Sequence, residues 1–252
     1  MAQSLERLDK VMVDRGLAES RSRAQAMILE GVVYVDGVLC TKAGKGVKPD
    51  SVIEVRENPL PYVSRGGLKL AHALETFHVP VAGKVCMDVG ASTGGFTDCL
   101  LQKGAERVYA VDVGYGQLAW KLRQDPRVVV LERQNIRYLP KELVPEPIEV
   151  VTIDTSFISL RLVIPAVLPF LDDNDAWLIA LIKPQFEAGR DKVGKGGVVK
   201  DEKVHMEVCD IISDFVKSLG LTVIGIVESP IRGQKGNREF IIVGRKIRNL
   251  SE

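Results

Sequence analysis

The sequence predicts an α/β protein in which a seven-stranded, doubly wound sheet follows a small α+β domain. Five short apolar segments alternate with helical stretches, a pattern typical of parallel strands covered by helices on both faces. Two further segments follow one another across the loop 229–238, so we expect the sheet to end in an antiparallel hairpin. The seven predicted strands are residues 85–89, 107–113, 128–132, 149–154, 176–182, 221–228 and 239–245.

Size and composition set broad limits. The 252 residues suffice for one large domain and a small one, and a hydrophobic content of 46% is that of an ordinary globular protein. The net charge of +1 makes no case for nucleic acid, so any RNA surface must come from local clustering. The charged N-terminus and the short apolar segments predict a cytoplasmic protein without a signal peptide or membrane contact.

The four cysteines show neither a C-x-x-C pair nor the spacing of metal ligands, so we expect reduced structural thiols and no metal.

Residues 1–58 are predicted to form the small domain. Leu5, Leu8 and Met12 recur at helical spacing, and Ser20 is a suitable N-cap for a second helix that Gly31 ends. Asp36-Gly37 between two apolar runs predicts a hairpin, with another strand at 52–55. Lysines and arginines gather in this domain, although an ordinary solvated face would look the same. They are Arg7, Lys10, Arg15, Arg21, Arg23, Lys42, Lys45 and Lys48.

Residues 59–66 are predicted to be a linker, because Pro59 and Pro61 disfavour helix. The large domain then spans residues 67–252 and opens with a helix that carries Lys69.

The stretch KVCMDVGASTGGFTDCLL, residues 84–101, organises the large domain. It reads as a buried strand, a glycine-rich turn at 90–95 and a helix whose free N–H groups face a ligand. Ser92 stands where a dinucleotide fingerprint requires glycine. Asp88 suits a cationic amino group, and Asp112, 22 residues beyond Gly90, suits a ribose diol. The pattern resembles an S-adenosylmethionine site more than a nicotinamide site, the alternative being a turn that only packs a helix on a sheet.

Two ionisable residues end neighbouring strands, Asp154 after VVTI and Lys183 after LIALI. Ligands of such sheets bind at the carboxyl ends of the strands, where two partly desolvated charges are coupled. The alternative is a purely structural ion pair.

Residues 189–195, GRDKVGK, fit most of a phosphate-binding loop. Gly196 replaces the hydroxyl residue that binds magnesium, and the segment does not directly follow a strand. We interpret residues 189–200 as a cationic loop near the active face.

The run RLDKVMVDRGLAESRSRAQAMILEGVVYVDG resembles an S4-like RNA-binding domain over residues 5–56. The resemblance implies that Arg7, Arg21 and Lys42 face RNA phosphates, contacts that position a protein without reading sequence. Further RNA contacts are predicted at Arg23, Arg65, Lys192 and Lys195.

Residues 62–245 resemble the FtsJ-like methyltransferases, and with the S4-like domain the chain resembles the TlyA family. The matching motifs are YVSRGG, DVGASTGGFT, VDVGYGQLAW, DTSFISL, KPQFEAGR and GNREF. The chain departs from some members at Leu60, where they carry arginine. The resemblance implies a Rossmann-like methyltransferase sheet and S-adenosylmethionine-dependent 2′-O-methylation of a cytidine in 16S or 23S rRNA, or in both. It assigns a catalytic tetrad to Lys69, Asp154, Lys183 and Glu239. Cofactor contacts are predicted at Asp88, Gly90, Ala91, Ser92, Thr93, Gly94, Gly95, Phe96, Asp112 and Asn135.

The chemistry fits this set. A ribose hydroxyl needs a base before it attacks a sulfonium methyl, and a lysine serves only in its neutral form. Lys69 would favour neutral Lys183 and Asp154 would favour charged Lys183, so the sequence leaves the balance open. No metal is needed, since the leaving group is a neutral thioether. Two alternatives remain: a non-catalytic rRNA-binding assembly factor, and a membrane-lytic protein, as the hemolysin label of some members suggests.

Overall fold

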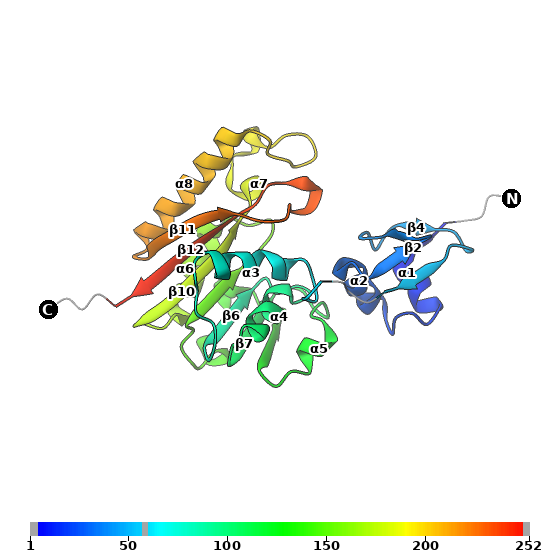
Figure 1. Cartoon of the computed structure of the whole chain (residues 1–252), viewed down its shortest axis with the longest axis horizontal. Helices are drawn as coiled ribbons and strands as arrows, with labels where there is room; N and C mark the ends of the chain where they lie inside the picture. The colour runs from blue at the N-terminus through cyan, green and yellow to red at the C-terminus, as the bar shows by residue number, and fades with distance from the viewer. Residues whose placement is uncertain (1–4, 57–59, 249–252) are drawn as a thin grey trace.

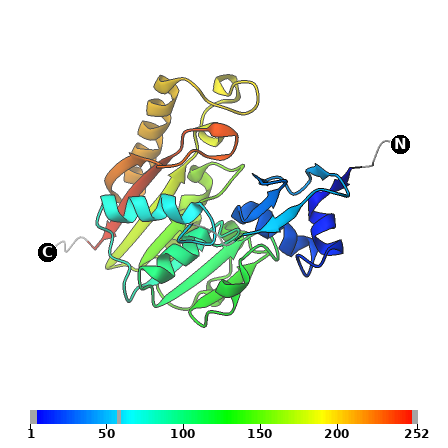
Figure 2. The same cartoon turned by 45° about the vertical axis from the view of Figure 1, so that its right-hand side comes forward.

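The computed structural model describes residues 5–56 and 60–248, so the predicted boundary between residues 58 and 59 lies outside the described residues. A small N-terminal unit stands beside a larger unit built on a seven-stranded sheet (Figures 1 and 2).

The N-terminal unit packs two helices on a small antiparallel sheet of order β3-β2-β5. Ser20 Oγ caps the second helix by accepting from Arg23 N at 3.2 Å, and Gly31 ends it with a φ of +77°. Asp36 and Gly37 both have positive φ, as a type I′ turn requires. The elements are β1 (Glu6–Arg7), α1 (Leu8–Asp14), α2 (Arg21–Glu30), β2 (Val33–Val35), β3 (Val38–Leu39), β4 (Gly46–Val47) and β5 (Ile53–Val55).

The start of the first helix was predicted incorrectly. Leu5 lies before the helix and is exposed, because β1 pairs in antiparallel fashion with β4 and holds residues 6 and 7 extended. Leu5 packs against Gly46, where a Cβ would lie 3.1 Å from the leucine Cβ. The helix therefore begins at Leu8, and the pair β1-β4 had no clear sequence signal.

The large unit has the predicted seven strands in the order β11-β12-β10-β9-β6-β7-β8. Strands β8, β7, β6, β9 and β10 run parallel, whereas β12 is antiparallel to both β10 and β11. The strands are β6 (Val85–Val89), β7 (Arg107–Asp112), β8 (Val128–Glu132), β9 (Val150–Ile153), β10 (Asp175–Ile182), β11 (Thr222–Glu228) and β12 (Phe240–Ile247). The helices are α3 (Gly66–Thr76), α4 (Gly95–Gln102), α5 (Trp120–Arg123), α6 (Leu160–Val167), α7 (Pro184–Glu187) and α8 (Glu202–Ser218).

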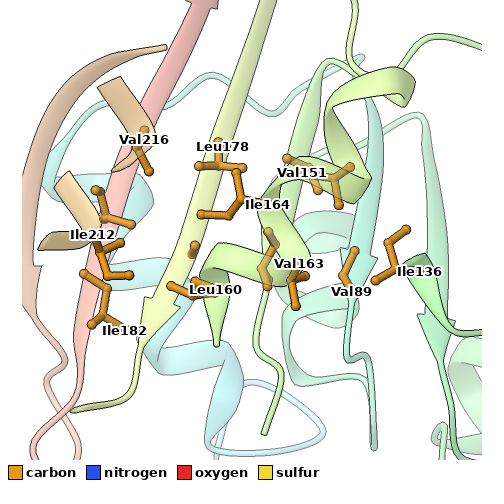
Figure 3. Packing of buried hydrophobic residues seen from close by; sticks show 14 of the residues in the cluster. Val89, Ile136, Val151, Leu160, Val163, Ile164, Leu178, Ile182, Ile212 and Val216 are labelled. Atoms are coloured by element: carbon orange, nitrogen blue, oxygen red, sulfur yellow. The ribbon is translucent and has the colours of Figure 1, made fainter. Parts of the chain in front are cut away.

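Helices bury both faces of the sheet. Along β10, Leu178 and Ile182 face the core under α6 and α8, and Ile179 and Leu181 face the core under α3 and α4. Figure 3 shows the first of these cores, with α6 contributing Leu160, Val163 and Ile164. Strands buried on both faces are apolar throughout, which is why the sequence identified them clearly.

The antiparallel β12 brings a further residue to the carboxyl edge of the parallel strands. Phe240, the first residue of β12, pairs with Ile182, the last residue of β10. Glu239 therefore lies level with Lys183, and both lie beside Asp154, which follows β9. The fold collects at one edge three charged residues that lie 29 and 56 positions apart in the chain.

Candidate active site

A cavity of about 490 Å³ opens at this edge of the sheet, between the glycine-rich turn and the loops that follow β10 and β11. All four residues of the predicted tetrad line it, as do Gly90, Ala91, Ser92, Thr93, Gly95 and Phe96. Sequence positions from 29 to 239 thus meet around a single hollow.

Lys183 and Asp154 form the first ion pair of the cavity. Lys183 Nζ lies 2.6 Å from Asp154 Oδ1, in an orientation that is not that of a hydrogen bond, and it donates to Ser156 Oγ at 2.9 Å. Both charged side chains are largely shielded from solvent. The amine is therefore held in position by two partners.

Lys69 and Glu239 form the second pair. Lys69, on α3, donates to Glu239 Oε2 at 2.6 Å, and the glutamate side chain is only 3% exposed. Gly233 packs directly on this carboxylate, since a Cβ there would lie 2.0 Å from Oε1. The pair is thus held by one helix, one strand and the loop 229–238.

The glycine-rich turn lies against the end of β9. A Cβ on Gly90 would meet the Asp154 carbonyl oxygen at 2.6 Å, and Gly90 has a φ of +85° that favours glycine. Gly94 also needs its conformation, with a φ of +95°, but a Cβ there would meet Leu122 and Leu118. Gly94 does not line the cavity, so packing against these leucines accounts for this glycine better than the approach of a cofactor does.

Asp88 lies beneath the turn rather than in the cavity. It is fully buried and accepts from Thr97 Oγ1 at 2.7 Å and from Thr152 Oγ1 at 3.0 Å. Burial raises the pKa of Asp88 to about 7, and the hydrogen bonds from the two threonines oppose that rise. This position argues against the predicted direct contact with a cofactor amino group and indicates that Asp88 ties the turn and α4 to the sheet.

Asp112 lies on the other side of the turn, in a small hollow that it shares with Ala91, Ser92 and Gln117. Its carboxylate accepts from Ser92 N at 2.7 Å and from Gly114 N at 2.6 Å. Each carboxylate oxygen has a second lone pair for a hydroxyl group. Asn135 is exposed and accepts from Arg137 N, so it lines neither hollow.

The N-terminal unit gathers two of its predicted RNA-binding residues around one buried carboxylate. Asp9 accepts from Arg7 Nε at 3.0 Å, from Arg21 at 3.1 Å and from Gln25 at 2.7 Å. The Arg7 guanidinium, aided by Gln25 and Arg21, holds the pKa of the Asp9 carboxyl well below its usual range. Arg7 Nη1 also lies 3.2 Å from where a Cβ on Gly44 would be, which places this pair beside the loop that carries exposed Lys42.

The remaining predicted RNA contacts are dispersed. Arg65 is exposed and lines the cavity, whereas Arg23 lines a separate hollow with Trp120 and Lys121. Lys192 forms an ion pair with Glu207 of α8 at 2.6 Å. Lys195 is exposed on the cationic loop, which contains a 3₁₀ turn at Arg190–Lys192 and follows the short helix α7 rather than a strand, unlike a phosphate-binding loop.

Several residues that line the cavity were not identified from the sequence. Phe157 is 89% exposed with a φ of +65°, and its ring centroid lies 5.1 Å from that of Phe186. Gln185 has a buried Oε1 without a partner in the described part of the chain. The motifs DTSFISL and KPQFEAGR contained these residues, and their position just after strand ends was the available signal.

None of the four cysteines lines the cavity. The four cysteines are free and buried, and burial raises the pKa of the Cys86, Cys99 and Cys209 thiols to about 12. Within residues 5–56 and 60–248, no group of three or more potential ligands could hold a metal ion.

The fold and the site are those of a methyltransferase, and the FtsJ-like methyltransferase family matches residues 62–246, while the S4 domain family matches residues 6–53. The chain belongs to the FtsJ-like methyltransferase family and is an S-adenosylmethionine-dependent enzyme. Its relatives of similar length place it among the TlyA proteins of that family.

Three relatives illustrate this placement. YqxC of Bacillus subtilis, whose name gives rRNA methyltransferase as a provisional label, is 51% identical over 96% of this chain and 86% of its own length. The 16S/23S rRNA (cytidine-2′-O)-methyltransferase TlyA of Mycobacterium tuberculosis is 45% identical over 94% and 88%. A solved structure from Streptococcus thermophilus, titled provisionally as a hemolysin, covers 98% of this chain and 90% of its own, with 42% identity and a TM-score of 0.75.

The buried Asp88 generates a prediction about pH. A folded-state pKa near 7, above the ordinary carboxyl value of 3.8, means that the folded protein loses stability as pH rises through that range, by up to roughly 4 kcal/mol. Asp88→Asn cannot ionise, so the stability of wild type relative to this variant should fall between pH 5 and pH 8. Urea unfolding at both pH values checks this, and a constant difference would contradict it.

Proposed function

We propose that this protein methylates the ribose 2′-OH of a cytidine in ribosomal RNA, 16S, 23S or both. The observation that carries the proposal is the pair of shielded ion pairs, Lys183–Asp154 and Lys69–Glu239, in one cavity beside the glycine-rich turn. The rRNA cytidine target is the one named for the M. tuberculosis relative. No helix within the described residues is long and apolar enough to cross a membrane.

The residues present fit S-adenosylmethionine. The first turn of α4 provides backbone N–H groups, and Asp112 provides a carboxylate for a ribose diol across the glycine-rich turn. Gln185 Oε1, buried at the cavity and without a hydrogen-bond partner among the residues that the structure describes, suits a ligand rich in donors. When bound, the cofactor supplies an electrophilic methyl group.

Lys183 is the proposed base. In its neutral form its Nζ takes the proton from the attacking hydroxyl, and Asp154 and Ser156 then hold the ammonium that forms. Such proton transfer typically contributes about 10²–10⁴-fold to a rate. Lys69 and Glu239 form a neutral pair that lines the same cavity, where they can position the sugar without adding net charge.

Phe157 is the proposed platform for the target base. An exposed phenylalanine in the left-handed region carries a strain of about 1–3 kcal/mol, which is typical of functional sites. Aromatic rings stack on unpaired RNA bases, and the Phe157 ring at the cavity wall faces solvent. Two exposed arginine–tyrosine pairs, Tyr115 with Arg133 and Tyr138 with Arg137, are further aromatic and cationic groups of this domain.

We propose the division of labour that the sequence indicated: an RNA-binding domain at residues 1–58, a linker at 59–66 and a catalytic domain at 67–252. Every nucleotide of RNA presents a 2′-OH, so selection of the site must come from surfaces outside the tetrad. The Arg7–Asp9–Arg21 cluster is well suited to phosphate, because Asp9 fixes the two guanidinium groups.

The cofactor assignment is tested at Asp112. Asp112→Ala removes the acceptor of Ser92 N and Gly114 N together with the proposed ribose contact, so the affinity for S-adenosylmethionine should fall at least tenfold. Calorimetry measures this, with Asp125→Ala, which breaks an ion pair at the amino end of β8, as the matched control. Equal affinities in both variants would remove Asp112 from the cofactor site.

The catalytic assignment is tested at Lys183. Lys183→Met should lower methyl transfer to rRNA by about 10²–10⁴-fold and leave cofactor affinity within threefold of wild type. The matched control is Lys84→Met, which breaks the Lys84–Glu149 ion pair near the amino end of the sheet and should keep activity within threefold. A Lys183→Met variant with near wild-type turnover would show that another group takes the proton.

The RNA assignment is tested at Arg21. Each phosphate contact contributes about one unit or slightly less to the slope of log affinity against log salt. Arg21→Ala should therefore weaken binding to an rRNA transcript and flatten that slope by about one unit, with cofactor affinity unchanged. Arg127→Ala, on the catalytic domain, is the control, and an unchanged slope for Arg21→Ala would refute the contact.

A further inference from the structure

Asn237 is a buried polar residue, 2% exposed, between two loops that line the cavity. Its Oδ1 accepts from Val199 N at 3.1 Å, and its Nδ2 donates to Gly197 O at 2.9 Å. The side-chain amide thus accepts one hydrogen bond from the backbone of the cationic loop and donates another to it, as the backbone of a neighbouring strand would. Neither cofactor binding nor proton transfer explains this arrangement.

The far side of the same segment is held by α8. His205, buried, places Nε2 3.0 Å from Val199 O, so both backbone polar groups of Val199 are engaged by side chains. Within the loop, Gly194 N donates to Val198 O at 3.0 Å. The end of the cationic loop is therefore fixed at residues 197–199.

Contacts continue from Asn237 to the second ion pair. Gly233 N donates to Asn237 O at 2.9 Å, and Gly233 packs on the Glu239 carboxylate that binds Lys69. Asn237 is also only two residues before Glu239 in the chain. A displacement of the loop end would therefore shift Glu239 through its contacts with Asn237 and Gly233.

The loop also presents positive charge. Lys195 and Lys200 are exposed on it, and Lys235 Nζ of the facing loop lies 3.7 Å from where a Cβ on Gly197 would be. Phosphate groups of an RNA entering the cavity would meet this charge first. The position of these lysines relative to the site depends on where the loop end is fixed.

We propose that Asn237 is a positioning residue that couples RNA held at the cationic loop to the Lys69–Glu239 pair. This inference rests on the proposed function and adds a coupling that the tetrad alone does not contain. Displacement of reacting groups by about 1 Å can lower a rate by about 10²-fold. Loss of the coupling should therefore lower kcat.

Two variants separate the two hydrogen bonds. Asn237→Leu keeps the approximate shape and loses both bonds, whereas Asn237→Asp keeps an acceptor for Val199 N and loses the donation to Gly197 O. Asn174→Leu, which changes an exposed asparagine at the amino end of β10, is the matched control. Hydrogen exchange of residues 194–199, measured on the protein alone, should accelerate in Asn237→Leu, less in Asn237→Asp and not in the control. Unchanged exchange in Asn237→Leu would overturn the anchoring, whatever the substrate is.

A double-mutant cycle with Lys195→Ala tests the coupling. In the wild-type background, Lys195→Ala should raise KM for rRNA about threefold to tenfold, and in the Asn237→Leu background less than twofold. Asn237→Leu itself should lower kcat about 10–100-fold with cofactor affinity within threefold. Equal effects of Lys195→Ala in both backgrounds, an effect below twofold in the wild-type background, or an unchanged kcat in Asn237→Leu would each overturn the proposal. If wild type transferred no methyl group to rRNA, the proposed function would fail, while the exchange result would still stand.

Discussion

The need to pair charges that solvent does not reach is the constraint on which the site depends. Lys183, Asp154, Lys69 and Glu239 lie largely shielded at one edge of an apolar sheet, and each finds its partner within 2.6 Å. Removing one partner of such a pair typically costs about 3–5 kcal/mol, whereas well-packed apolar residues in place of both often stabilise a protein as well. Stability alone therefore does not account for two such pairs in one cavity, and their place beside the glycine-rich turn points to chemistry.

The fold meets this constraint through the antiparallel strand β12. Parallel strands bring their last residues to the carboxyl edge, which supplies Asp154 and Lys183. A strand of opposite direction brings its first residues there, which supplies Glu239 and makes the loop 229–238 a wall of the cavity. The helix α3 completes the set with Lys69.

The sequence predicted the sheet well because its central strands are buried on both faces and therefore read as continuous apolar runs. The full tetrad was predicted only by resemblance to the family, because the positions of residues at strand ends identified Asp154 and Lys183 alone. The sequence did not distinguish the roles of residues that are close to one another in the chain. Asp88, at the end of β6, and Gly94, in the turn, lie close in sequence to Ala91, which lines the cavity. Gly94 nevertheless packs against leucines and Asp88 is enclosed by threonines, and only three-dimensional packing separates these environments. The short strand β1 was missed for a related reason, since two residues carry no periodicity.

The central claim, methylation of a cytidine ribose in ribosomal RNA, is tested most directly in the cell. Mass spectrometry can map 2′-O-methylcytidine in 16S and 23S rRNA from cells that carry the gene and from cells that lack it. We predict at least one cytidine that is methylated only when the intact gene is present. Identical methylation of both rRNAs in the two strains would contradict the assignment.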